Sequence, residues 1–267
     1  MTDLALARPL PRLDPDPVLL GTTLVLLVAL VPVGLAMGLD PRTVAGDSVW
    51  LKPAKFLIAL ALYTGTLAAY ATWMDPGVRA HTAYRAFTWI VTAAIAGEMA
   101  WIGAASLLGT ASHYNTAGVW AVLYPLMGIL AVTLTAMAPV VGWGILKGGD
   151  GLAPAMKLAL VLGLMLTFAL TVPIAGTLAQ LPGHFVGTPV TGAAVPVLGW
   201  SREVGDPRIA HFLATHALHV LPLMGLVALA LPDAQGRALV WASAAGFSAV
   251  TLAVFAQALA GRPLFPV

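Results

Sequence analysis

Three histidines lie in an otherwise lipid-soluble stretch, AHFLATHALHVLPL, which runs from residue 210 to 223. On a helix, His216 and His219 lie about 60° apart around the axis, and His211 lies about 80° from His219. All three imidazoles therefore share one side of that helix. Imidazoles three residues apart can bind one metal ion, and a carboxylate from another helix can complete the ligand set. The alternative is that each imidazole only hydrogen-bonds a backbone carbonyl in a kinked helix.

Two more histidines, His113 and His184, lie in segments that we expect at the same end of the molecule. We predict a metal site formed by His211, His216, His113, His184 and His219. Because the chain has no cysteine, zinc, copper or iron would bind through imidazole and carboxylate ligands, and a single haem held by histidine is also open.

Glu98, Lys52 and Lys55 are the candidate catalytic residues. Glu98 and His219 lie at similar depths, about 15 Å from the ends of their helices at 1.5 Å per residue. Ionisable groups at such a depth mark a functional site or a paired polar cluster. The two lysines, three residues apart in WLKPAKF, are expected on one face of their helix. There they would pair with Glu98, bind an anionic substrate or extend to lipid headgroups.

The composition indicates where these residues are held. Hydrophobic residues make up 60% of the chain and charged residues 9%, against roughly 25% charged in soluble domains. A lipid bilayer is therefore the predicted surrounding. The net charge of +2 and the lack of a basic run argue against a nucleic-acid partner.

Apolar runs of about 20 residues are long enough to cross a bilayer as helices, and only helices or closed barrels satisfy their backbone there. We predict an all-α integral membrane protein, a single domain over residues 1–267 with seven transmembrane helices. The expected spans are about 18–37, 52–73, 84–108, 117–146, 154–181, 207–231 and 237–260, with a long outer loop at 182–206. Kinks are expected at the interior prolines Pro32, Pro125, Pro139, Pro173 and Pro222.

Lysine and arginine set the expected orientation. Once residues at span ends are set aside, basic residues favour the side of the N-terminus, which predicts a cytoplasmic N-terminus and a C-terminus outside. The first apolar run is longer than a signal-peptide core, so we interpret it as a retained span of a bacterial inner-membrane protein.

Four short blocks, VWLKPAKF, TASHYN, GHFVG and GDPRIAHFLATHAL, resemble a family of uncharacterised bacterial multi-pass membrane proteins. The resemblance implies that seven residues belong to the family pattern: Lys52, Lys55, His113, His184, Arg208, His211 and His216. It also implies that His219 stands where the family has a Gln. It brings no activity with it.

Three functions follow from these residues. The first is a metal- or haem-dependent redox or hydrolytic protein, with a quinone or another small molecule as partner and Glu98 as base. The second is a proton-coupled transporter or channel, in which Glu98 and the histidines relay protons. The third is a membrane anchor or pH-sensing subunit of a complex, gated by histidine near pH 6.

Overall fold

The computed structural model describes residues 13–115 and 118–267. In these residues, seven helical segments are long and apolar enough to cross a membrane. They are α1 (Pro17–Leu39), α2 (Leu51–Tyr70) with the 3₁₀ turn η1 (Ala71–Trp73), α4 (Thr82–Leu107), α5 (Val119–Thr135) with α6 (Met137–Lys147), α7 (Pro154–Leu178), α8 (Arg208–Ala228) and α9 (Asp233–Leu259). The predicted all-α architecture with seven candidate spans is confirmed. The predicted orientation stays a prediction.

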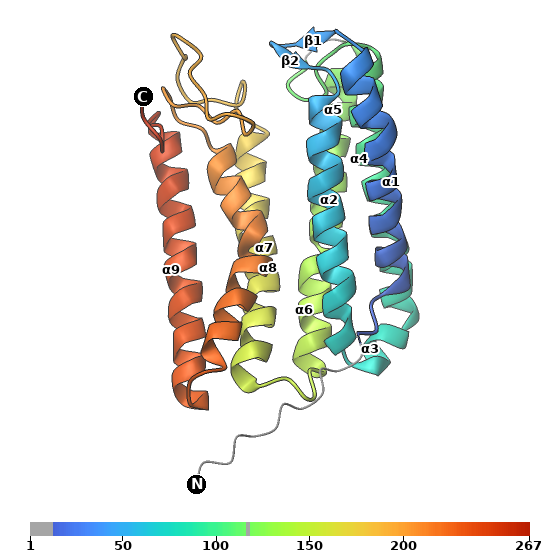
Figure 1. Cartoon of the computed structure of the whole chain (residues 1–267), viewed down its shortest axis with the longest axis vertical. Helices are drawn as coiled ribbons and strands as arrows, with labels where there is room; N and C mark the ends of the chain where they lie inside the picture. The colour runs from blue at the N-terminus through green and yellow to red at the C-terminus, as the bar shows by residue number, and fades with distance from the viewer. Residues whose placement is uncertain (1–12, 116–117) are drawn as a thin grey trace.

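The helices form two groups joined through α6 (Figure 1). α7, α8 and α9 pack against one another on one flank, and α1, α2 and α4 pack on the other. A two-stranded hairpin, β1 (Thr43–Val44) with β2 (Asp47–Ser48), lies at one end of the bundle. We call this the hairpin end, and the loop between α7 and α8 and the C-terminus lie there too. The short helix α3 (Pro76–Ala80) lies at the opposite end.

Capping fixes the start of α1 at that opposite end. Asp16 accepts hydrogen bonds from the backbone N–H groups of Val18 and Leu19, both at 3.0 Å. Pro17 follows at the first helical position, where its missing N–H removes no helical bond. The hydroxyl of Tyr84 donates to the other oxygen of Asp16 at 2.9 Å, which ties α1 to α4.

The fourth span is broken at Ala136, between α5 and α6. A proline cannot donate to the carbonyl four residues earlier, so Pro139 leaves the carbonyl of Thr135 without its usual donor. The hydroxyl of Tyr63 on α2 reaches the carbonyls of Leu134 and Thr135 at 3.0 and 3.1 Å. The disturbance expected from Pro139 is thus an interruption at Ala136, whose backbone stays close to helical, within one candidate span.

α8 is tied to two neighbours at its own proline. Pro222 leaves the carbonyl of Leu218 without its helical donor. Tyr70 on α2 donates to that carbonyl at 3.1 Å, and the hydroxyl of Thr167 on α7 accepts from the N–H of Leu218 at 2.9 Å. A side chain at Gly163 would lie 2.9 Å from the carbonyl oxygen of Ala217, so the backbones of α7 and α8 are close-packed.

Candidate functional site

The start of α2 is held in place by a short network at the hairpin end. Asp40, just after α1, accepts hydrogen bonds from the Arg42 guanidinium and from the indole N–H of Trp50 at 2.8 Å. These donors, Arg42 first, hold the pKa of the Asp40 carboxyl well below its usual range. The network fixes the residue that precedes α2, and therefore the position of Lys52.

Lys52 on α2 lies against His113, which is 61 residues away in the loop after α4. The Lys52 Nζ is 3.0 Å from His113 Nδ1, and the Ser112 hydroxyl lies 3.1 Å from the same nitrogen. The indole of Trp101 donates to the Ser112 carbonyl at 2.8 Å and fixes this part of the loop. Burial, followed by the charge of Lys52 and by His184, lowers the pKa of His113 to about 3. The imidazole is therefore neutral, and its Nδ1 accepts a hydrogen bond from the Lys52 ammonium.

Glu98 on α4 lies within electrostatic range of the same amine. Its side chain is only 4% exposed, and its Oε1 has no hydrogen-bond partner among the described residues. Lys52 and Glu98 attract each other electrostatically, although they form no direct ion pair in the described part of the chain. The site thus combines an ammonium hydrogen-bonded to an imidazole with a buried carboxyl nearby, and these are the kinds of group that serve as general acids and bases.

Lys55 does not join this group. Its side chain is exposed, whereas that of Lys52 is partly buried beside His113. Lys55 lies about 60° further around the helix, and its exposure fits the alternative that its amine extends to lipid headgroups. A catalytic role for Lys55 stays a prediction.

His184 and Arg208 complete the hairpin end from the other flank. The ring of His184 lies edge-on to the ring of Tyr114, with centroids 4.8 Å apart. Burial, followed by the charges of Arg208 and Lys52, lowers the pKa of His184 to about 4. Arg208 donates to Asp206 at 2.8 Å. We call Lys52, Glu98, His113, His184 and Arg208 the hairpin-end cluster.

The long loop between α7 and α8 is ordered by its own polar groups. Glu203 accepts from the backbone N–H groups of Val190 and Thr191, at 2.6 and 3.0 Å, and from the Thr191 hydroxyl. These donors, the hydroxyl first, lower the pKa of Glu203 to about 2. Arg202 donates to the carbonyl of Pro266 at 2.9 Å and ties the loop to the C-terminal segment. The loop thus holds His184 at one end and Arg208 at the other.

The three histidines of α8 form a separate group. The rings of His216 and His219 have centroids 5.2 Å apart, and His216 stacks on Phe212 at 4.1 Å. His216 Nδ1 donates to the carbonyl of Phe212 at 3.0 Å. His219 Nε2 lies 3.0 Å from the hydroxyl of Thr66 on α2. The Nδ1 atoms of His211 and His219 are buried and have no hydrogen-bond partner within residues 13–115 and 118–267.

The five predicted metal ligands are therefore divided between two places. His113 and His184 belong to the hairpin-end cluster, whereas His211, His216 and His219 lie on α8, where the last two rings meet. In the described parts of the chain, no three His, Asp or Glu side chains are arranged to hold one metal ion. The structure gives no support to a common five-histidine metal site.

Several polar residues at these places were not expected from the sequence. Ser112 and Tyr114 flank His113, and Thr66 and Tyr70 lie on α2. Lys52 and Tyr70 are 18 residues apart, which is about five helical turns, so they lie on the same face. The period of polar residues along α2 could have identified this face before the structure.

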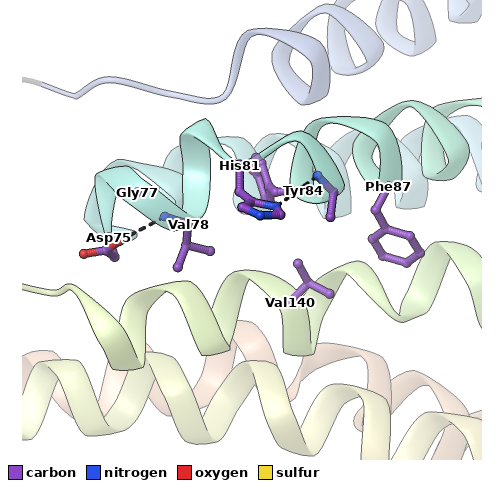
Figure 2. Close-up of a pocket in the computed structure, with 8 residues that line it drawn as sticks. Asp75, Gly77, Val78, His81, Tyr84, Phe87 and Val140 are labelled. Atoms are coloured by element: carbon purple, nitrogen blue, oxygen red, sulfur yellow. Dashed lines mark hydrogen bonds between the residues drawn. The ribbon is translucent and has the colours of Figure 1, made fainter.

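The remaining histidine, His81, lines a hollow at the end of the bundle opposite the hairpin (Figure 2). This hollow has a volume of about 540 Å³ and includes Tyr84, Phe87 and Val140 in its lining. His81 Nδ1 accepts from the backbone N–H of Ala83 at 3.2 Å and caps α4. Asp75 caps α3 in the same way at Val78. Both polar side chains have structural partners, so we assign this hollow no function.

No family model, no curated protein and no solved structure matches this chain. The resemblance to an uncharacterised membrane family therefore stays a prediction, and function is argued from the residues.

Proposed function

We propose that this protein is a proton-coupled membrane transporter for a small anionic solute, which binds at the hairpin-end cluster. The observation that carries the proposal is the contact between Lys52 Nζ and His113 Nδ1 at 3.0 Å, beside the buried carboxyl of Glu98. Ionisable side chains inside candidate spans are costly and mark ion or proton pathways.

The hydrogen-bonding capacity of the cluster favours an anion. His113 accepts at Nδ1, so its neutral ring has its proton on Nε2 and can donate there. The neutral ring of His184 supplies another N–H, and Lys52 has three. A carboxylate or phosphate oxygen matches such donors, and its arrival would shift the charge balance between Lys52 and Glu98.

The rest of the bundle supplies what a transporter needs beyond the site. Hydrogen-bonded pairs of polar side chains continue toward the opposite end, with Thr22 and Thr92 3.1 Å apart and Thr23 and Thr64 2.8 Å apart. Buried apolar side chains of the core lie between the level of Glu98 and these pairs: Leu60, Ala61 and Ile95. Alternating access requires such a closed layer on one side of the site.

At the hairpin-end cluster, the pH-sensing hypothesis is less favoured. A sensor that acts near pH 6 needs a histidine that changes charge there. The pKa values of His113 and His184 lie at about 3 and 4, so both rings stay neutral at pH 6.

The test uses purified full-length protein in liposomes that contain a pH-sensitive dye. Acetate, lactate, succinate and inorganic phosphate are added outside, with protein-free liposomes as the blank. We expect at least one solute to change the internal pH, and the rate to fall about 100-fold in Glu98→Gln and Lys52→Met, as for removal of a general acid or base.

Lys55→Met is the matched control, because Lys55 is exposed on the same helix three residues away. It should transport at the wild-type rate. Wild-type rates in Glu98→Gln would overturn the proposal. So would stoichiometric zinc, copper or iron in untagged protein that is lost in His216→Gln, since this result would favour the metal-dependent reaction.

A further inference from the structure

We propose that a groove between α2 and α8 binds the reduced, hydroxyl-bearing form of a lipid-soluble quinone. This α2–α8 groove has a volume of about 360 Å³ and lies between the second half of α2 and the middle of α8. Ala61, Gly65 and Ala69 line it every fourth residue along α2, and Leu62, Thr66, Tyr70 and His219 complete its lining. The groove is separate from the hairpin-end cluster and goes beyond the proposed transport.

The hydroxyl protons in the groove are already used in hydrogen bonds to backbone carbonyls, and Thr66 is the first example. Its hydroxyl donates to the backbone carbonyl of Leu62 at 2.7 Å. The hydroxyl oxygen can therefore only accept from His219 Nε2, which lies 3.0 Å away. The proton of the neutral His219 ring is thus on Nε2, and its Nδ1 is an acceptor that no described residue satisfies.

Tyr70 and His216 likewise donate their protons to backbone carbonyls. The hydroxyl of Tyr70 donates to the carbonyl of Leu218 at 3.1 Å, so its oxygen offers lone pairs only. His216 donates through Nδ1 to the carbonyl of Phe212 at 3.0 Å, which makes its Nε2 an acceptor. The polar lining at and beside the groove therefore accepts hydrogen bonds and has few protons to give.

A matching ligand must donate hydrogen bonds and must dissolve in lipid. A quinone offers carbonyl oxygens, which only accept, whereas its reduced form has two hydroxyl groups that donate. The small residues on the floor allow a flat ring to approach the helix, and a volume at the lower end of the usual range for ligand sites suits one ring. The exposed side chain of Leu62 lies at the edge, where a long apolar tail can enter the lipid.

The test compares decylubiquinol with decylubiquinone, which have the same tail and ring and differ in the two hydroxyl protons. Both are titrated without oxygen into full-length protein in nanodiscs, and binding is followed by quenching of tryptophan fluorescence. Trp73 is a suitable reporter because its ring lies 6.3 Å from that of Tyr70. We expect the reduced form to bind at least about 100-fold more tightly, because the oxidised form leaves the acceptors unpaired.

Two variants test the assigned residues. Thr66→Val keeps the shape but removes the acceptor of His219, and His219→Leu removes the imidazole. Each should reduce the preference for the reduced form to about threefold or less. His81→Gln, at the opposite end of the bundle, should keep the wild-type preference. Size-exclusion profiles confirm that each variant is folded.

Three results would overturn the proposal. These are equal binding of the two redox forms, unchanged preference in folded Thr66→Val, and equally tight binding of farnesol, which would assign the groove to lipid alcohols. Lys52→Met separates the two proposals, because it should lose transport and keep quinol binding.

Discussion

The hairpin-end cluster and the α2–α8 groove both contain neutral imidazoles, yet they offer opposite hydrogen-bonding groups. At the hairpin end, Lys52 donates a hydrogen bond to His113, and the cluster as a whole is rich in donors. In the groove, Thr66 and Tyr70 give their protons to backbone carbonyls, and the side chains are left as acceptors. The same residue type therefore predicts different ligands at the two places.

The difference comes from the helices that surround each imidazole. In the apolar middle of the bundle, prolines leave backbone carbonyls without their helical donors, and threonines and tyrosines have hydroxyl protons to donate. These groups must hydrogen-bond to one another, because a lipid surrounding offers them no water. At the hairpin end, loops bring charged side chains from both flanks together. Whether a nitrogen of such a histidine donates or accepts a hydrogen bond is therefore decided by where its neighbours already donate their own protons.

The largest effect is expected from removing the charge at the hairpin end. Lys52→Met removes the hydrogen bond to His113 and the charge that compensates the buried Glu98 carboxyl. Leaving a buried polar group uncompensated in this way costs up to about 3 kcal/mol. Lys55→Met should change stability by less than about 0.5 kcal/mol, because this side chain is exposed. Reversible unfolding in mixed micelles measures both.

The double variant Lys52→Met with Glu98→Gln is the decisive control. It removes the orphaned charge and should recover most of the loss. Equal instability in the single and double variants would show that Lys52 acts through packing alone.

The next effect is a dependence of stability on pH. The unfolded chain binds a proton at His113 with a pKa near 6.5, whereas the folded chain binds it at about 3. The unfolded state therefore holds more protons between these values, and stability falls as the pH drops below 6.5. At pH 5 the loss from His113 should be about 2 kcal/mol.

Comparison of wild type and His113→Gln at pH 7.5 and 5 isolates this contribution. The variant should lose less stability on acidification, and His184 should account for part of the remainder. Parallel curves for the two proteins would mean that His113 is already solvated in the folded state.

The sequence predicted the spans well because apolar length is a local property of the chain. The interruption at Ala136 shows the limit, since a kink was expected at Pro139 but the contacts around it were not. The carbonyl that Pro139 frees is paired with Tyr63 from another span, and spacing along the fourth span does not predict this partner.

The candidate site was predictable only in part. Spacing along one helix correctly placed His216 beside His219. The pairing of Lys52 with His113 depends on how a loop folds back over α2, and helical spacing contains no information about it. The same limit explains why the five histidines were expected to meet and do not.

A smaller effect is expected at the proline of α8. Tyr70→Phe removes the donor to the Leu218 carbonyl that Pro222 leaves free, which should cost about 1 kcal/mol. In a Pro222→Ala background the helix supplies its own N–H, so the same substitution should cost almost nothing. A double-mutant cycle measures this coupling, and equal costs in both backgrounds would show that Tyr70 acts only by packing.

The smallest effect is expected from His216→Gln. The His216 ring donates to the carbonyl of its own helix at Phe212, and such a bond adds little because it competes with the helical one. We expect a loss of about 0.5 kcal/mol or less, near the average for polar side-chain bonds in helical membrane proteins. A loss above about 2 kcal/mol would mean that the Nε2 of His216 binds a further group. Such a group would make the middle of α8 a ligand site. The acceptors beside the groove would then already be paired, and the difference from the donor-rich hairpin end would no longer hold.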